Sequence, residues 1–169
     1  MIRIRVLITI ASLFAAMHSS PVAAEDRDSD KGKEVVGRIK ATLYIGSDTE
    51  PGEWASKYPL VGEETAGQMR GIEQMDFRFY RKLGDDTQVV FRSYENWLAP
   101  IKPSDEILLS FESRGLSADN GLRLDLEFWQ NRRKIIQINP VLNAGKPLLI
   151  LGPSWRGCRM IIAVELVEK

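Results

Sequence analysis

Apolar residues recur at every second position through most of the chain, which is the spacing of a strand with one buried face. The alternation is clearest in 122–129, where apolar residues alternate with Arg123, Asp125, Glu127 and Trp129. The last such segment is apolar on both faces, which favours a central place in a sheet. The pattern predicts strands over 35–45, 75–83, 89–94, 106–112, 122–129, 134–138, 146–151 and 159–167.

Turn-forming residues separate these segments, and each turn predicts how two strands connect. Gly84-Asp85-Asp86 is typical of a hairpin turn between 75–83 and 89–94. Asp119-Asn120-Gly121 and Asn131-Arg132-Arg133 predict two more hairpin turns, since Asn favours positive φ. Gly152 to Gly157 predicts a loop between the last two strands.

One segment has helical rather than strand spacing. Residues 63–73 begin with Glu63 and Glu64 and carry Arg70 late, which complements the dipole of a helix. Met69 and Ile72 are spaced to share one face of that helix, whereas Gly67 and Gly71 weaken it. We therefore expect a short helix near 63–73.

Together these elements predict a mainly β, single-domain antiparallel β-sandwich over residues 35–169. It has about eight strands and at most one short helix. A chain of this length buries roughly two-thirds of its unfolded surface, enough for one hydrophobic core. We favour a sandwich over a barrel, because no segment alternates small residues in the way that would open a ligand cavity.

The first 24 residues have the pattern of a cleaved secretory signal peptide. Arg3 and Arg5 precede an apolar run over 6–17, and Val22-Ala23-Ala24 supplies a small-residue cleavage site. The run is shorter than the roughly 20 residues that a membrane span needs. We therefore expect a periplasmic or secreted protein without a transmembrane segment after cleavage. The polar residues 25–34 that follow are expected to form a flexible arm.

Composition removes most familiar catalytic and metal chemistry. The one histidine, His18, lies in the predicted leader, and Cys158 is the one cysteine. Without histidine, the exported form has no Ser-His-Asp or Cys-His catalysis and no His-based metal site. We predict neither a metal nor a cofactor. Lys and Arg together number 23, as do Asp and Glu, and this balance argues against a nucleic-acid partner.

Aromatic residues in and beside loops favour a non-enzymatic binding module whose partner is an unknown protein or carbohydrate. Trp155 and Arg156 stand between Gly152 and Gly157 and have the composition of an interface anchor. A Trp at such a place also often folds back to cap the sandwich, with the Arg stacked on it. Both interpretations remain open at this point.

The alternative function is a glycoside-acting or carbohydrate-binding domain centred on Tyr94, Glu95 and Trp97. Aromatic side chains on both sides of Glu95 could desolvate its carboxyl and make it a general acid. A glycosidase needs a second carboxylate, for which Asp105 or Glu112 is available. Otherwise Glu95 is an ordinary acid at a strand end, solvated or paired with Arg92.

Overall fold

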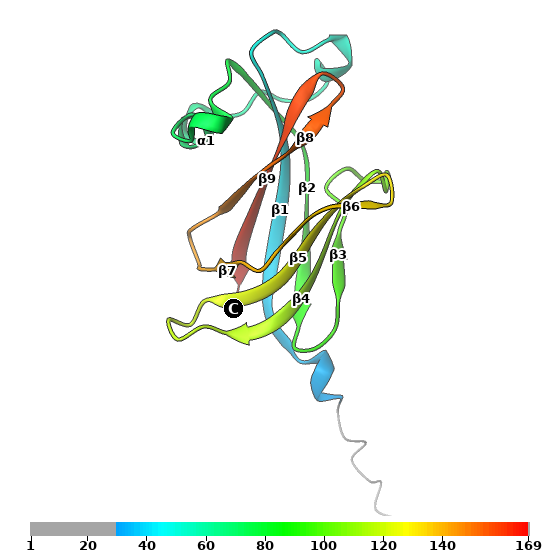
Figure 1. Cartoon of the computed structure of the whole chain (residues 1–169), viewed down its shortest axis with the longest axis vertical. Coiled ribbons are helices and arrows are strands. Elements are labelled where there is room, and N and C mark those ends of the chain that lie inside the picture. The colour runs from blue at the N-terminus through cyan, green and yellow to red at the C-terminus, as the bar shows by residue number, and fades with distance from the viewer. Residues whose placement is uncertain (1–29, 169) are drawn as a thin grey trace, which may run out of the picture.

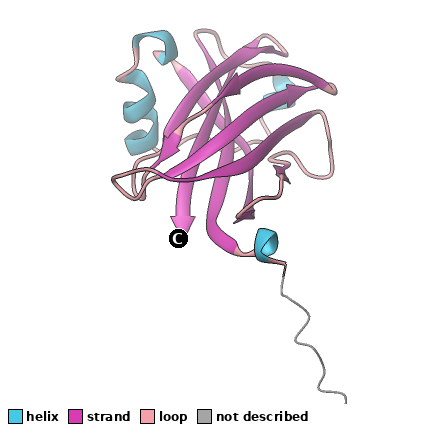
Figure 2. Ribbon diagram, turned by 60° about the horizontal axis from the view of Figure 1, so that its bottom comes forward, coloured by secondary structure: helices cyan, strands magenta, loops and turns pink. Residues whose placement is uncertain are grey.

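The computed structural model describes residues 30–168, which form two antiparallel sheets packed face to face (Figure 1, Figure 2). The β1 sheet has the order β2-β1-β9-β8 and consists of β1 (Val35–Ser47), β2 (Phe79–Phe91), β8 (Leu148–Trp155) and β9 (Cys158–Glu168). The β5 sheet has the order β3-β4-β5-β6, with β7 also beside β5; it consists of β3 (Asn96–Leu98), β4 (Ile107–Leu116), β5 (Leu122–Gln130), β6 (Arg133–Ile138) and β7 (Val141–Leu142).

The predicted fold class is confirmed: the described chain is a mainly β sandwich with one α-helix. It has nine strands within residues 30–168 rather than the eight expected. The short β3 and β7 were not predicted. The predicted leader 1–24 and residues 25–29 of the predicted arm lie outside the described residues.

The core lies between the two sheets and is filled by the alternating apolar residues. In β5 the side chains that point inward are at most 2% exposed, while Arg123 between two of them is exposed. Burying one such side chain contributes roughly 1.5–3 kcal/mol. As its two-sided apolar pattern predicted, β9 has a central place in its sheet, between β1 and β8.

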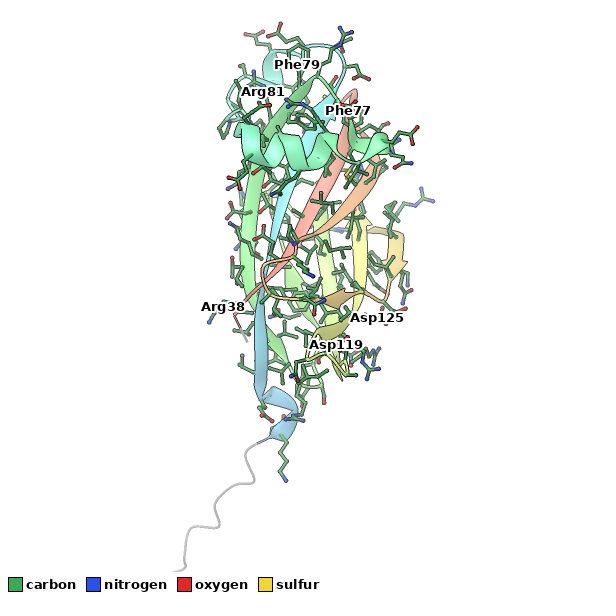
Figure 3. The ribbon with its side chains drawn as sticks, turned by 90° about the vertical axis from the view of Figure 1, so that its left-hand side faces the viewer. Arg38, Phe77, Phe79, Arg81, Asp119 and Asp125 are labelled. Atoms are coloured by element: carbon green, nitrogen blue, oxygen red, sulfur yellow. The ribbon has the colours of Figure 1, made fainter. Side chains whose placement is uncertain are left out.

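The predicted helix forms as α1 (Glu63–Arg70) and covers part of the outer face of the β1 sheet, as Figure 3 shows. Its Ala66 and Met69 pack with Met75, Tyr80 and Ile161 in a second apolar cluster outside the main core. This cluster explains why β9 needs apolar residues on both faces. No helix within residues 30–168 is long and apolar enough to cross a membrane.

The predicted hairpin turn at Gly84-Asp85-Asp86 is wrong, because β2 runs through these residues without interruption. Opposite β1 the register moves from Leu43–Gly84 to Tyr44–Lys82, which is a β-bulge. A Cβ on Gly84 would stand 2.1 Å from the carbonyl oxygen of Pro100. The glycine therefore allows the backbone at Pro100 to approach β2 closely, and the chain does not reverse direction there.

The other two hairpin turns are confirmed, and the last loop is shorter than expected. Asn120 has φ 61°, while Asn131 and Arg132 have φ 49° and 61°, as tight hairpin turns require. In the last hairpin only Arg156 and Gly157 form the turn, because β8 continues to Trp155. The expected loop therefore contributes most of its residues to β8, around a register shift between Leu151 and Ser154.

Candidate functional site

Trp155, one of the residues predicted to bind a partner, is built into the end of the sandwich. Its side chain is 6% exposed and meets Trp54 edge to face, with ring centroids 5.3 Å apart. Its indole Nε1 donates a hydrogen bond to Glu106 Oε1 at 2.6 Å. Trp155 thus caps the core, which is the alternative that the sequence left open.

Arg156 lies over this aromatic cap. Its guanidinium carbon is 4.4 Å from the centroid of the Trp155 ring and 5.5 Å from that of Trp54. Its Nη2 is 3.8 Å from Glu106 Oε2, and half of the side chain remains exposed. Arg156 therefore shields the cap from solvent while its own cationic edge stays at the surface.

Tyr94, the second predicted binding residue, turns toward the start of the described chain. Its hydroxyl donates a hydrogen bond to Asp30 Oδ2 at 2.7 Å, and its ring lies against Gly32. This hydrogen bond and the negative charge of Asp30 raise the pKa of Tyr94, while the same bond lowers the pKa of Asp30. Tyr94 is thus committed to a contact within the chain.

The same contact joins the described part of the predicted arm to the rest of the sandwich. The helical turn Lys31–Lys33 has Asp30 as its N-cap. The backbone N–H of Ser93 donates to Gly32 O at 3.1 Å. Residues 30–34 therefore lie against the chain that follows β2.

Glu95 is exposed, and the aromatic walls expected around it are not formed. Tyr94 contacts Asp30, whereas Trp97 turns to the face of the β5 sheet. Of the two possible partner acids, Asp105 forms an ion pair with Arg132 at 3.4 Å. Glu112 is paired with Arg114 at 3.0 Å. The pairing of β3 with β4 ends at Asn96 and Phe111, so that Glu95 and Glu112 are not paired across the strands.

Trp97 lies on the outer face of the β5 sheet, where it meets Trp129. Their ring centroids are 5.8 Å apart and the rings are tilted by 56°. Trp97 is 39% exposed. The register places Trp97 opposite Ser110, and Ser110 opposite Glu127 of β5. The small Ser110 leaves room above β4, so that two tryptophans from strands that are not neighbours come into contact.

Polar side chains beside this tryptophan pair form a connected network across β5 and β6. The Glu127 carboxylate accepts hydrogen bonds from Trp129 Nε1 and from Lys134 Nζ, both at 2.9 Å. Lys134 also donates to Gln137 Oε1 at 2.9 Å. Gln137 Nε2 then donates to Asp125 Oδ1 at 3.1 Å. The face presents ordered donors and acceptors next to an exposed indole.

Arg114 continues the network onto β4. Its Nη2 contacts Asp125 Oδ2 at 3.3 Å and Glu112 Oε2 at 3.0 Å. Asp125, labelled in Figure 3, thus accepts from both neighbouring strands. The predicted binding residues included Trp97 but neither Trp129 nor the network, although the polar positions of 122–129 already marked one outward face.

Residues 30–168 contain no group of three or more His, Cys, Asp or Glu side chains that could hold a metal ion. Cys158 is the first residue of β9 and is buried, and this burial raises the pKa of its thiol. Comparison of the chain with family models, curated proteins and solved structures finds no match.

Proposed function

We propose that the chain is an exported, non-enzymatic binding module that holds a saccharide on the outer face of the β5 sheet. The observation that carries this proposal is the contact between Trp97 and Trp129 beside an ordered polar network. Export is proposed from the pattern of the first 24 residues, which would place the module in the periplasm or outside the cell.

A saccharide suits this face because it has two kinds of surface. The C–H groups of a pyranose ring form an apolar patch that can lie on an indole, and indoles offer large apolar area. The ring's hydroxyls both donate and accept hydrogen bonds. Glu127 and Asp125 are acceptors, Lys134 is a donor and Gln137 is both, so that neighbouring hydroxyls would find complementary partners.

The open geometry favours binding over catalysis. Glu95 is exposed and lacks the enclosing aromatic rings that a general acid would need. We therefore place Tyr94 and Glu95 outside the binding surface and keep Trp97 at its centre.

Trp97→Ala is expected to weaken saccharide binding at least tenfold, a loss of about 1.4 kcal/mol. Affinity electrophoresis against a panel of soluble polysaccharides measures this, because bound protein is retarded in the gel. Glu95→Gln should behave as the unaltered protein. Leu60→Ala is the matched control, since Leu60 is 68% exposed and lies away from the β5 sheet.

Two results would contradict the proposal. One is that no polysaccharide in the panel retards the unaltered protein. The other is that a polysaccharide retards the Trp97→Ala and unaltered proteins equally. Loss of retardation in Glu95→Gln alone would instead favour the carboxylate-centred site that the sequence suggested.

A further inference from the structure

A cleft of about 330 Å³ opens at the end of the sandwich where the chain enters β1. In Figure 1 this end carries the helical turn Lys31–Lys33, and it is opposite the end with the β8–β9 turn. The cleft lies between the start of β1 and the end of β2 on one side and the β4–β5 hairpin on the other. Glu34, Val35, Arg92, Ser113, Leu116 and Leu122 are among the residues that line it.

The walls of the cleft are apolar and partly open to solvent. Val35 is 55% exposed and Leu116 is 48% exposed, whereas Leu122 beneath them is fully buried. An apolar group placed between Val35 and Leu116 would remove their exposed surface from water, at roughly 25 cal/mol per Å². The volume falls near the lower end of small-molecule sites, about 300–1,000 Å³, which favours a compact ligand.

The rim of the cleft carries a cation whose partner is weakly held. Arg92 Nε and Nη2 approach the same Glu34 oxygen, Oε2, at 2.7 and 2.6 Å. Both side chains are 55% exposed. An exposed ion pair of this kind contributes about 0–1 kcal/mol, so that another anion can replace or join Glu34 at little cost. Guanidinium groups bind carboxylates in paired hydrogen bonds, which suits this exchange.

A second polar group lies deeper in the cleft. Ser113 is 7% exposed, and its hydroxyl accepts a hydrogen bond from the backbone N–H of Gly115 at 3.2 Å. Because the oxygen serves as the acceptor in that bond, the hydroxyl proton can be donated to a ligand. Apolar walls with a few convergent polar groups are the usual composition of a small-molecule site.

We propose that this cleft binds a compact amphipathic monocarboxylate, with its hydrocarbon body between Val35 and Leu116 and its carboxylate on Arg92. The site is separate from the tryptophan face and does not depend on saccharide binding. Octanoate is a suitable probe, and octan-1-ol is its uncharged counterpart.

The test uses two variants for which the proposal predicts opposite effects. Titration of the purified protein with octanoate, followed by calorimetry or by NMR, measures the affinity. Arg92→Gln removes the cation and is expected to weaken octanoate binding at least tenfold. Glu34→Gln removes the competing carboxylate and is expected to tighten binding two- to fivefold. Lys146→Gln, which removes an exposed cation in the β7–β8 connection, is the control and should change nothing.

Octan-1-ol distinguishes a site that recognises the carboxylate from a groove that binds any hydrocarbon chain. It is expected to bind more weakly than octanoate, and its affinity should be equal in the unaltered and Arg92→Gln proteins. The proposal is overturned if octanoate does not bind at millimolar concentration. It is also overturned if both variants change the affinity in the same direction or if neither changes it. A cooperative thermal unfolding transition establishes that each variant is folded. We expect all three to fold, because the substituted side chains are exposed.

Discussion

Trp155→Ala is expected to lower the free energy of unfolding by about 3–5 kcal/mol, the usual cost of removing a buried Trp or Phe. The side chain is 6% exposed and packs against Trp54, so that its removal leaves a cavity at the end of the core. The variant also leaves Glu106 without its 2.6 Å hydrogen bond from the indole. Urea denaturation followed by circular dichroism measures the change.

Arg156→Ala is the matched control for the same cluster. Half of this side chain is exposed, and it contributes through cation–π contacts and a 3.8 Å ion pair. Its removal is expected to cost no more than about 1 kcal/mol. A Trp155→Ala protein that is as stable as the unaltered one but fails to bind its ligand would contradict the capping role and would restore Trp155 as an anchor.

Asp86→Ala is expected to lower the free energy of unfolding by about 2–4 kcal/mol, because it leaves several donors without an acceptor. Asp86 is 7% exposed and joins β2 to the connection that leads into β4. Its carboxylate accepts from the backbone N–H of Ala99 at 2.9 Å and from Lys102 Nζ at 2.6 Å. It also accepts from its neighbour Thr87 N–H at 3.0 Å.

The same carboxylate makes stability depend on acid pH. Burial acts to raise the pKa of Asp86, but hydrogen bonds from Ala99, Lys102 and Gln88 and the charge of Lys102 outweigh it and lower the pKa. A carboxyl with a lowered pKa in the folded state stabilises the fold fully above its unfolded pKa. That contribution is lost as pH falls below about 5 and then through the folded pKa.

Asp86→Asn isolates this effect, because it keeps the shape of the side chain and removes its titration. The difference in urea midpoint between the unaltered and Asn proteins should shrink as pH falls from 7 toward 3. A constant difference across that range would contradict the assignment of this acid dependence to Asp86.

Much of the fold was predictable because one face of each long strand is buried. The apolar–polar alternation in 35–45 and 122–129 follows from the burial of one strand face, and these two segments are indeed parts of β1 and β5. The hairpin turn at Gly84 was wrongly predicted because glycine and aspartate occur both in turns and inside strands, where they make close or polar contacts with distant parts of the chain. Here Gly84 admits the carbonyl of Pro100, and Asp86 binds groups 13 and 16 residues further along the chain. Such contacts leave no periodic pattern.

The candidate site was only partly predictable for a related reason. Tyr94, Glu95 and Trp97 are close in sequence, but Tyr94 and Trp97 turn to different partners. The partner of Tyr94 is Asp30, 64 residues away. The partner of Trp97 is Trp129, reached across the small Ser110, and only the strand register brings them together. Local sequence therefore identified the aromatic residue but not the surface that it forms.

The central claim is that ligand meets the Trp97–Trp129 pair and not the Trp54–Trp155 cap. The four tryptophans give four indole N–H signals in a ¹⁵N-labelled protein, which is the most direct measurement. On titration with an oligosaccharide from the polysaccharide that retards the protein, we expect the Trp97 and Trp129 signals to shift and the other two to stay. Shifts confined to Trp54 and Trp155, or to none of the four, would contradict the claim.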